Sequence, residues 1–153
     1  MHNKISTVQE ALERYKEAVN ELDVEKLLSA YSSDIHIYDC WGSWESKGKN
    51  DWRESVTEWF SGLKEEGVKL QAVFDDLVIE EGENTAFSHC ALTFEAYNIE
   101  KEEKLRQITN RFTFCLKKAN GSWAITHEHS SLPIDMQNGK GMFNLRSLII
   151  PMF

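Results

Sequence analysis

Residues 106–133 read RQITNRFTFCLKKANGSWAITHEHSSLP, and this stretch decides the fold. Two alternating runs flank Asn120-Gly121, a strong hairpin signal because both turn positions need residues that tolerate positive φ. Side chains of a strand alternate between its two faces. The stretch therefore predicts two paired strands with one face turned to a core or pocket. That face of the first run is apolar apart from one amide: Ile108, Asn110, Phe112, Phe114 and Leu116.

The second run predicts a pocket wall that begins as core and ends in two imidazoles. Thr126 and Glu128 then take the opposite face. The residues of equal parity on the predicted pocket face are Trp123, Ile125, His127 and His129.

One amide and one guanidinium stand next to each other in the first run. A buried amide without a partner costs roughly 1–3 kcal/mol, so Asn110 must find a protein, water or ligand partner. Regular pleating sends Arg111 to the outer face, and only a β-bulge would bring it into the pocket. We therefore place Asn110 ahead of Arg111 as a pocket residue.

Size and composition indicate one globular domain. The chain has 153 residues, 41% hydrophobic and 27% charged, with a net charge of -8. An acidic chain disfavours nucleic acid and anionic membranes, which attract basic patches. The start lacks the apolar core of a signal peptide, and no apolar run approaches the roughly 20 residues that span a bilayer. Three widely spaced cysteines predict reduced thiols in a cytoplasmic protein, and neither a cofactor nor a metal bound by these cysteines is expected.

The first half of the chain predicts three helices and one strand. A capping box at Thr7 and Glu10 begins a helix whose apolar stripe turns Tyr15 inward. Asp23 caps a second, short helix, and Asn50 is predicted to cap a third, which carries Trp52 and Phe60 on its inner stripe. These two aromatic side chains are most simply core, and contact with a ligand is the alternative.

The strand between the second and third helices carries a carboxylate on its apolar face. Asp39 continues the face of Ile35 and Ile37 toward Trp41, which opens a loop rich in tryptophan. A carboxylate there has its pKa raised by desolvation or is held by donors. The alternative is a plain turn former near Gly42.

Helices first and antiparallel strands afterwards predict an α+β fold. We expect a curved antiparallel sheet wrapped around the N-terminal helix, with two further helices, as a cystatin-like cone with a central pocket. The domain is predicted over residues 1–133. Residues 134–153 form an extension predicted to pack on the domain or at a dimer interface, and its apolar end, from Leu145 to Phe153, is predicted to be ordered.

Two segments resemble the nuclear transport factor 2-like superfamily, in particular its SnoaL-like and ketosteroid-isomerase-like members, over roughly residues 5–133. One runs from Arg14-Tyr15 to Asp39, and the other from Gly121-Ser122-Trp123 to Pro133. The first is similar to the isomerase segment that bears an oxyanion-hole tyrosine and a general-base aspartate. The resemblance implies those roles for Tyr15 and Asp39.

The resemblance also implies a third group, because the protonated aspartic acid of the isomerases corresponds to Asn110. An amide can donate a hydrogen bond but cannot transfer a proton. Cys40 stands where the isomerases have proline after their base, and they lack the histidine pair. The second segment is also similar to the association domain of calcium/calmodulin-dependent kinase II, which is not an enzyme.

Three functions stay open from the sequence. The first is an isomerase or cyclase acting on a hydrophobic carbonyl compound, with Asp39 as general base and Tyr15 and Asn110 as oxyanion donors. The second is a non-catalytic ligand-binding or oligomerisation module. The third is a metal site formed by His127, His129 and a carboxylate such as Asp39.

The predicted ligand is a small hydrophobic molecule, and the predicted assembly is a homodimer. The dimer would form through an outer sheet face that is weakly charged for solvent exposure, as Thr109, Thr113 and Cys115 indicate. The residues expected to contact the ligand, besides the three catalytic candidates, are Trp41, Trp52, Phe60, Phe112, Arg111, His127 and His129.

Overall fold

The computed structural model of the protein describes residues 4–143 and 145. Three helices precede most of the strands, as expected for an α+β fold. The elements in chain order are α1 (Val8–Glu21), α2 (Val24–Leu28), β1 (Tyr31–Tyr38), β2 (Ser46–Lys47), α3 (Gly48–Glu66), β3 (Val68–Glu81), β4 (Thr85–Asn98), β5 (Lys104–Ala119) and β6 (Ser122–Ser131).

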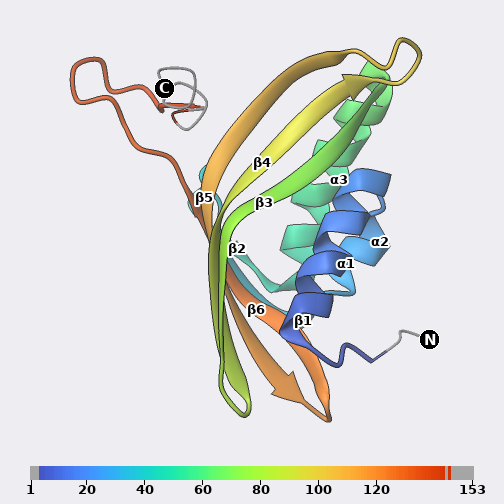
Figure 1. Ribbon diagram of the computed structural model, residues 1–153, viewed down its shortest axis with the longest axis vertical. Coiled ribbons are helices and arrows are strands. Elements are labelled where there is room, and N and C mark those ends of the chain that lie inside the picture. The colour runs from blue at the N-terminus through green and yellow to red at the C-terminus, as the bar shows by residue number, and fades with distance from the viewer. Residues whose placement is uncertain (1–3, 144, 146–153) are drawn as a thin grey trace.

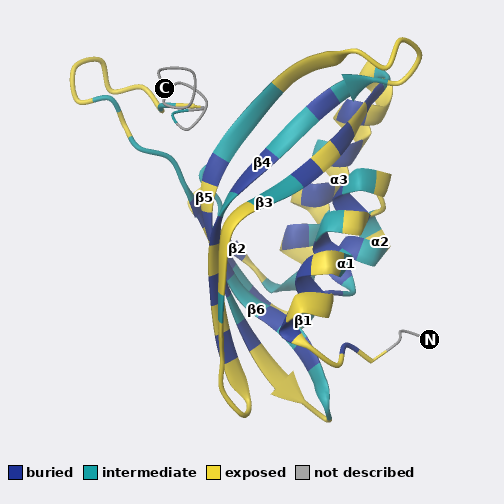
Figure 2. Cartoon of the chain, in the orientation of Figure 1, coloured by how far each residue is buried: buried dark blue, intermediate teal, exposed yellow. Residues whose placement is uncertain are grey.

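The strands form one curved sheet in the order β2-β1-β6-β5-β4-β3. All neighbours are antiparallel except β1 and β6, which run parallel. Parallel strands need a long connection, and the chain from β2 to β5 provides it here. The three helices lie on one face of this sheet (Figure 1). Buried residues concentrate where the helices face the strands (Figure 2). The predicted α+β class, with a curved sheet wrapped on an N-terminal helix, is confirmed.

Helix α1 begins and faces inward as its sequence predicts. Thr7 accepts a hydrogen bond from the N–H of Glu10, and the Glu10 carboxylate reaches back to the N–H of Ser6. The buried stripe is Val8, Ala11, Leu12, Tyr15, Ala18 and Val19.

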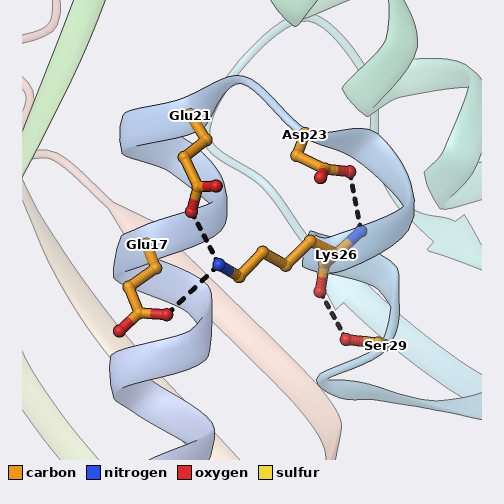
Figure 3. A network of polar contacts seen from close by, with 5 residues as sticks. All are labelled: Glu17, Glu21, Asp23, Lys26 and Ser29. Carbon is orange, nitrogen blue, oxygen red and sulfur yellow. Dashed lines mark hydrogen bonds and ion pairs between the residues drawn. The ribbon is translucent and has the colours of Figure 1, made fainter. Parts of the chain in front are cut away.

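Ion pairs connect α2 to α1 (Figure 3). The Nζ atom of Lys26 lies 2.6 Å from Glu21 and 3.2 Å from Glu17, and both carboxylates belong to α1. Asp23 caps α2 by accepting from the N–H of Lys26, as predicted.

Helix α3 begins at Gly48, so the prediction that Asn50 caps it is wrong. The N-cap residue is Lys47, whose side chain makes no capping bond. Asp51 satisfies the N–H of Lys47 from inside the helix instead. The helix ends at Gly67, which adopts the left-handed conformation that glycine tolerates best.

The predicted hairpin joins β5 to β6. Asn120 and Gly121 have φ values of 53° and 75°, and Ala119 pairs directly with Ser122. This geometry is the two-residue turn that positive φ at both positions permits.

The extension beyond β6 leaves the sheet on the side away from the helices (Figure 1). Ile134 and Gly141 form a bridge, and the N–H of Met142 donates to the carbonyl of Pro133. The Phe143 ring then stacks on Trp41, with ring centroids 5.5 Å apart. The segment predicted to be ordered, from Leu145 to Phe153, lies outside the described residues except for position 145.

Candidate active site

A β-bulge in β6 decides which side chains face the helices. Cys115 of β5 pairs with His127, but Leu116, the next residue, pairs with Ile125. Thr126 is therefore the extra residue of the bulge, and its hydroxyl donates to the carbonyl of Cys115. One extra residue reverses the parity of everything that follows it in the strand.

The prediction that His127 and His129 line the pocket is therefore wrong. Beyond the bulge Glu128 and Ser130 face inward and are buried, while the two imidazoles lie on the outer face of the sheet. The His127 ring packs edge-on to Tyr38, and its Nδ1 atom lies 2.6 Å from the carbonyl oxygen of His36.

The suggested metal site at His127, His129 and Asp39 does not form, because Asp39 lines the cavity on the other face. Across residues 4–143 and 145, no cluster of three or more His, Cys, Asp or Glu side chains is arranged to hold a metal ion.

A cavity of about 900 Å³ lies between the sheet and the helices, within the size range of small-molecule sites. Its walls are mostly aromatic and aliphatic, and they are interrupted by carboxyl groups, by one guanidinium group and by the amides of Gln107 and Asn110. The residues that carry the argument below are Tyr15, Asp39, Trp52, Asn110, Phe112 and Glu128.

Asp39 reaches this cavity from the end of β1 and is half-buried. Its Oδ1 atom accepts a hydrogen bond of 3.1 Å from Ser130, whose hydroxyl in turn accepts from the N–H of Cys40 at 3.0 Å. Burial raises the pKa of Asp39, while the donors Ser130, Cys40 and Trp41 oppose that rise. Asp39 is therefore oriented by hydrogen-bond donors and lies in a largely apolar cavity.

Tyr15 reaches the same cavity from α1. Its ring lies edge-on to Phe114, with centroids 5.4 Å apart, and tilted against Phe74 at 6.4 Å. Burial raises its phenol pKa well above the ordinary value, and the nearby carboxyl groups of Glu128 and Asp39 raise it further. The hydroxyl therefore stays protonated and can act as a hydrogen-bond donor.

Asn110 comes from β5 and is buried beside Cys40. Its Nδ2 atom lies 3.1 Å from Cys40 Sγ, and its Oδ1 atom has no partner among the described residues. Burial raises the pKa of the Cys40 thiol, which therefore keeps its proton. Turning the amide over lets the thiol donate to Oδ1 and frees Nδ2 for a ligand, since the two amide ends differ only in hydrogen-bonding role.

Strand alternation in the sequence placed Glu128 on the face opposite to the pocket, but the structure places it in the cavity wall. It is buried in the cavity wall, and its Oε1 atom accepts a hydrogen bond from the hydroxyl of Tyr31. Burial raises the pKa of Glu128 to about 8, assisted by the charge of Asp39 and opposed by the bond from Tyr31. At neutral pH this carboxyl group holds its proton.

The remaining predicted contact residues divide into two groups. Trp41, Trp52 and Phe112 line the cavity. Phe60 and Arg111 do not: Phe60 is fully buried in the core, and Arg111 points outward from a β5 that stays regular at this point. The inward and outward alternation of side chains is therefore regular around Arg111 in β5, whereas the bulge interrupts it in β6.

No sequence signal reveals Glu128 and Ser130 as cavity residues. A bulge is set by the twist of the sheet and by pairing between strands, and threonine at position 126 is an ordinary strand residue. Ser130 could have been found only through its bond to Asp39, which joins residues 91 positions apart.

Membrane crossing by a helix finds no support in this fold. Within the described residues, none of the helices combines the length and the apolar composition needed to span a bilayer.

Comparisons with solved structures show the same fold at low sequence identity. An NTF2-like protein from Pseudomonas putida KT2440 superposes with a TM-score of 0.79 at 22% identity, covering 90% of this chain and 92% of that one. A ketosteroid isomerase-like protein from Erwinia carotovora atroseptica gives 0.63 at 19%, covering 86% and 97%. A calcium/calmodulin dependent protein kinase II association domain, described as putative, from Xanthomonas campestris gives 0.67 at 16%, covering 86% and 96%.

No curated protein sequence matches the chain. A family model does, and it spans residues 8–135, from the first residue of α1 to just past the end of β6. This range contains the whole sheet, the three helices and each of the cavity groups described above. The chain therefore belongs to the SnoaL-like domain family.

Proposed function

We propose that the protein binds a small, neutral, hydrophobic carbonyl compound and moves a proton on it, as an isomerase or cyclase does. The observation that carries the proposal is the meeting of Tyr15, Asp39 and Asn110 in one largely apolar cavity. These residues belong to α1, the end of β1 and β5, so the fold alone brings them together.

The chemistry assigned to each group follows from its surroundings. Asp39 is a base raised in pKa by burial, which strengthens it as a proton acceptor, and Ser130 orients it. Tyr15 is a protonated donor in a site with little water, where a hydrogen bond to a developing oxyanion is strong. Asn110 supplies the second donor once its amide is turned toward the ligand.

Charge on the cavity wall supports a neutral ligand over an anionic one. Four carboxyl groups line the cavity: Asp39, Glu58, Glu66 and Glu128. The cavity's one basic lining residue among the described residues, Arg106, already makes two bonds of 2.8 Å to Glu66. An anion would therefore meet carboxylates without a free cation.

The test uses 2-tetralone, a neutral bicyclic ketone with exchangeable protons beside its carbonyl. We expect the wild type to accelerate exchange of these protons with deuterium oxide, measured by mass spectrometry. Asp39→Asn should remove the acceleration because an amide is no base. Tyr15→Phe should keep binding and slow exchange by on the order of 100-fold, as loss of an oxyanion donor does.

Asp34→Asn is the matched control, since Asp34 is exposed on the same strand and outside the cavity. Its exchange rate should equal that of the wild type. Equal rates in wild type and Asp39→Asn would contradict the assignment of Asp39 as base.

A second function, assembly without catalysis, is favoured by one observation. The outer face of the sheet exposes apolar side chains, with Phe87 at 47% and Tyr38 at 38% relative exposure. Such a patch fits the oligomerisation that the sequence predicts. It would coexist with a ligand cavity on the opposite face, so the two functions do not exclude each other.

A further inference from the structure

Glu128 is a buried carboxyl group that the proposed roles of Asp39, Tyr15 and Asn110 leave unused. It lines the cavity, and only 3% of its surface is exposed. The hydroxyl of Tyr31 holds its Oε1 atom, which leaves Oε2 to meet a ligand. Burying a carboxyl group in an apolar wall costs free energy of folding, which favours a functional role for Glu128.

Tyr31 is itself fixed in place. It is buried, and its ring lies edge-on to Trp52, with centroids 6.3 Å apart. Trp52 also lines the cavity. A carboxyl group held by a phenol that is packed against an indole has few alternative positions, which is the requirement for a group that must meet a reacting atom.

Glu128 and Asp39 lie diagonally across neighbouring strands. Glu128 pairs with Ile37 in the parallel ladder of β1 and β6, and Asp39 follows Ile37 by two positions, just past the end of β1. Both carboxyl groups also act on the phenol of Tyr15. Both carboxyl groups line the same cavity, so one ligand can touch both of them.

Their surroundings favour the charged form of Asp39 more than that of Glu128. Asp39 has donors at Ser130 and at the main chain of Cys40 and Trp41, all of which favour the charged form. Glu128 has a single donor, Tyr31, and is more deeply buried. Two carboxyl groups separated in this way can serve one as base and the other as acid.

We propose that Glu128 is a second catalytic residue, which gives its proton to the carbonyl oxygen of the ligand while Asp39 removes a proton from the adjacent carbon. Tyr31 is the positioning residue that holds Glu128. This assignment rests on the proposed function.

The step balances without another reactant. The Asp39 carboxylate takes the proton from the carbon beside the carbonyl, and the C–H electron pair becomes the C=C bond of an enol. The π pair of the carbonyl moves to its oxygen, which receives the proton of Glu128. On return, Asp39 gives its proton to the same carbon or to a conjugated one, and the Glu128 carboxylate takes back the proton from oxygen.

The first arm of the test needs no ligand. Infrared spectroscopy of the apo protein at neutral pH should show the carbonyl band of one buried protonated carboxyl group, in the wild type and in Asp39→Asn alike. Glu128→Gln, which conserves shape and still accepts from Tyr31, should lose the band. A band absent from the wild type, or one that persists in Glu128→Gln, overturns the proposal.

The second arm measures deuterium exchange of 2-tetralone. Glu128→Gln should bind the ketone with unchanged affinity and exchange it at least about 100-fold more slowly than the wild type, as loss of a general acid does. Tyr31→Phe should move the alkaline limb of the pH–rate profile to higher pH, because the Tyr31 bond lowers the pKa of Glu128. A merely structural role for Tyr31 would leave that limb in place.

The two proposals fail differently. Loss of exchange in Asp39→Asn with a wild-type rate in Glu128→Gln overturns the role of Glu128 and leaves Asp39 as the base. Loss in Glu128→Gln with a wild-type rate in Asp39→Asn supports Glu128 and removes Asp39. A wild type that does not accelerate exchange overturns both catalytic roles.

Discussion

At the scale of residues, two carboxyl groups of the cavity differ in the number of hydrogen-bond donors that contact them. Asp39 is oriented by a hydroxyl and main-chain N–H groups, whereas Glu128 meets one phenol in a buried wall. Desolvation raises both pKa values, but it acts with less opposition on Glu128. This difference in opposition is the physical basis for the proposed roles of Asp39 as base and Glu128 as acid.

This difference has a consequence for stability, because Glu128 binds its proton more tightly in the folded state. An unfolded glutamate releases its proton near pKa 4.5, and folded Glu128 near 8. Between these values the folded state binds more protons, so the free energy of unfolding should fall as pH rises, by at most about 1.4 kcal/mol per pH unit for this group.

Urea unfolding at several pH values checks this expectation. Glu128→Gln should flatten the decline between pH 4.5 and 8, because glutamine does not titrate. Asp39 keeps its own contribution of the same sign in both proteins, so the difference between them isolates Glu128. Glu80→Gln changes an exposed carboxyl of β3 and should keep the wild-type slope. Parallel curves for wild type and Glu128→Gln would rule out the tight proton.

At the scale of elements, a glycine inside α3 lowers the stability of the helix and leaves space in the cavity. Gly62 lies inside this helix and lines the cavity, and a Cβ atom added there would meet no atom within 4 Å. Glycine inside a helix costs about 0.5–1 kcal/mol relative to alanine. The empty space over Gly62 is therefore kept at a cost to the folded state.

Gly62→Ala should accordingly raise the free energy of unfolding by about 0.5–1 kcal/mol, measured by urea titration. Gly62→Leu should fill part of the cavity and weaken the binding of 2-tetralone, measured by calorimetry. Ser61→Leu on the exposed face of the same helix is the control and should leave binding unchanged. A destabilised Gly62→Ala would show that the space is closed in solution.

At the scale of the whole molecule, the two faces of the sheet support two different proposed functions. The helix side encloses the cavity, and the outer side carries an apolar and aromatic patch that includes Tyr38, Val78, Phe87 and His129. A stable dimer buries roughly 800 Å² on each partner, and such a patch on a long sheet can supply it. Homodimerisation through this face remains our prediction.

Light scattering at tens of micromolar should report a dimer for the wild type. Phe87→Glu should shift it to a monomer, because a carboxylate in the centre of an apolar interface is desolvated without a partner. Leu105→Glu places the same charge on an exposed residue of β5 and should remain dimeric. A monomeric wild type would contradict the predicted interface.

Local sequence was enough to determine the elements and most of their faces. The Asn120-Gly121 turn, the caps at Thr7 and Asp23 and the inward stripe of Tyr15 depend on contacts a few residues apart, which periodicity records. The regular pleat of β5 likewise fixed Asn110 as buried and Arg111 as exposed.

Only the tertiary structure shows that Glu128, the proposed acid, lines the same cavity as Asp39. The bulge at Thr126 arises from pairing between β5 and β6, and it moves His127 and His129 outward and Glu128 inward. Phe60, expected to touch the ligand, is instead enclosed by core packing. A β-bulge depends on how two strands pair, so the periodicity of one strand does not record it. The sequence by itself therefore determined the fold and the positions of Tyr15, Asp39 and Asn110, whereas the pairing of β5 with β6 determined those of Glu128 and Ser130.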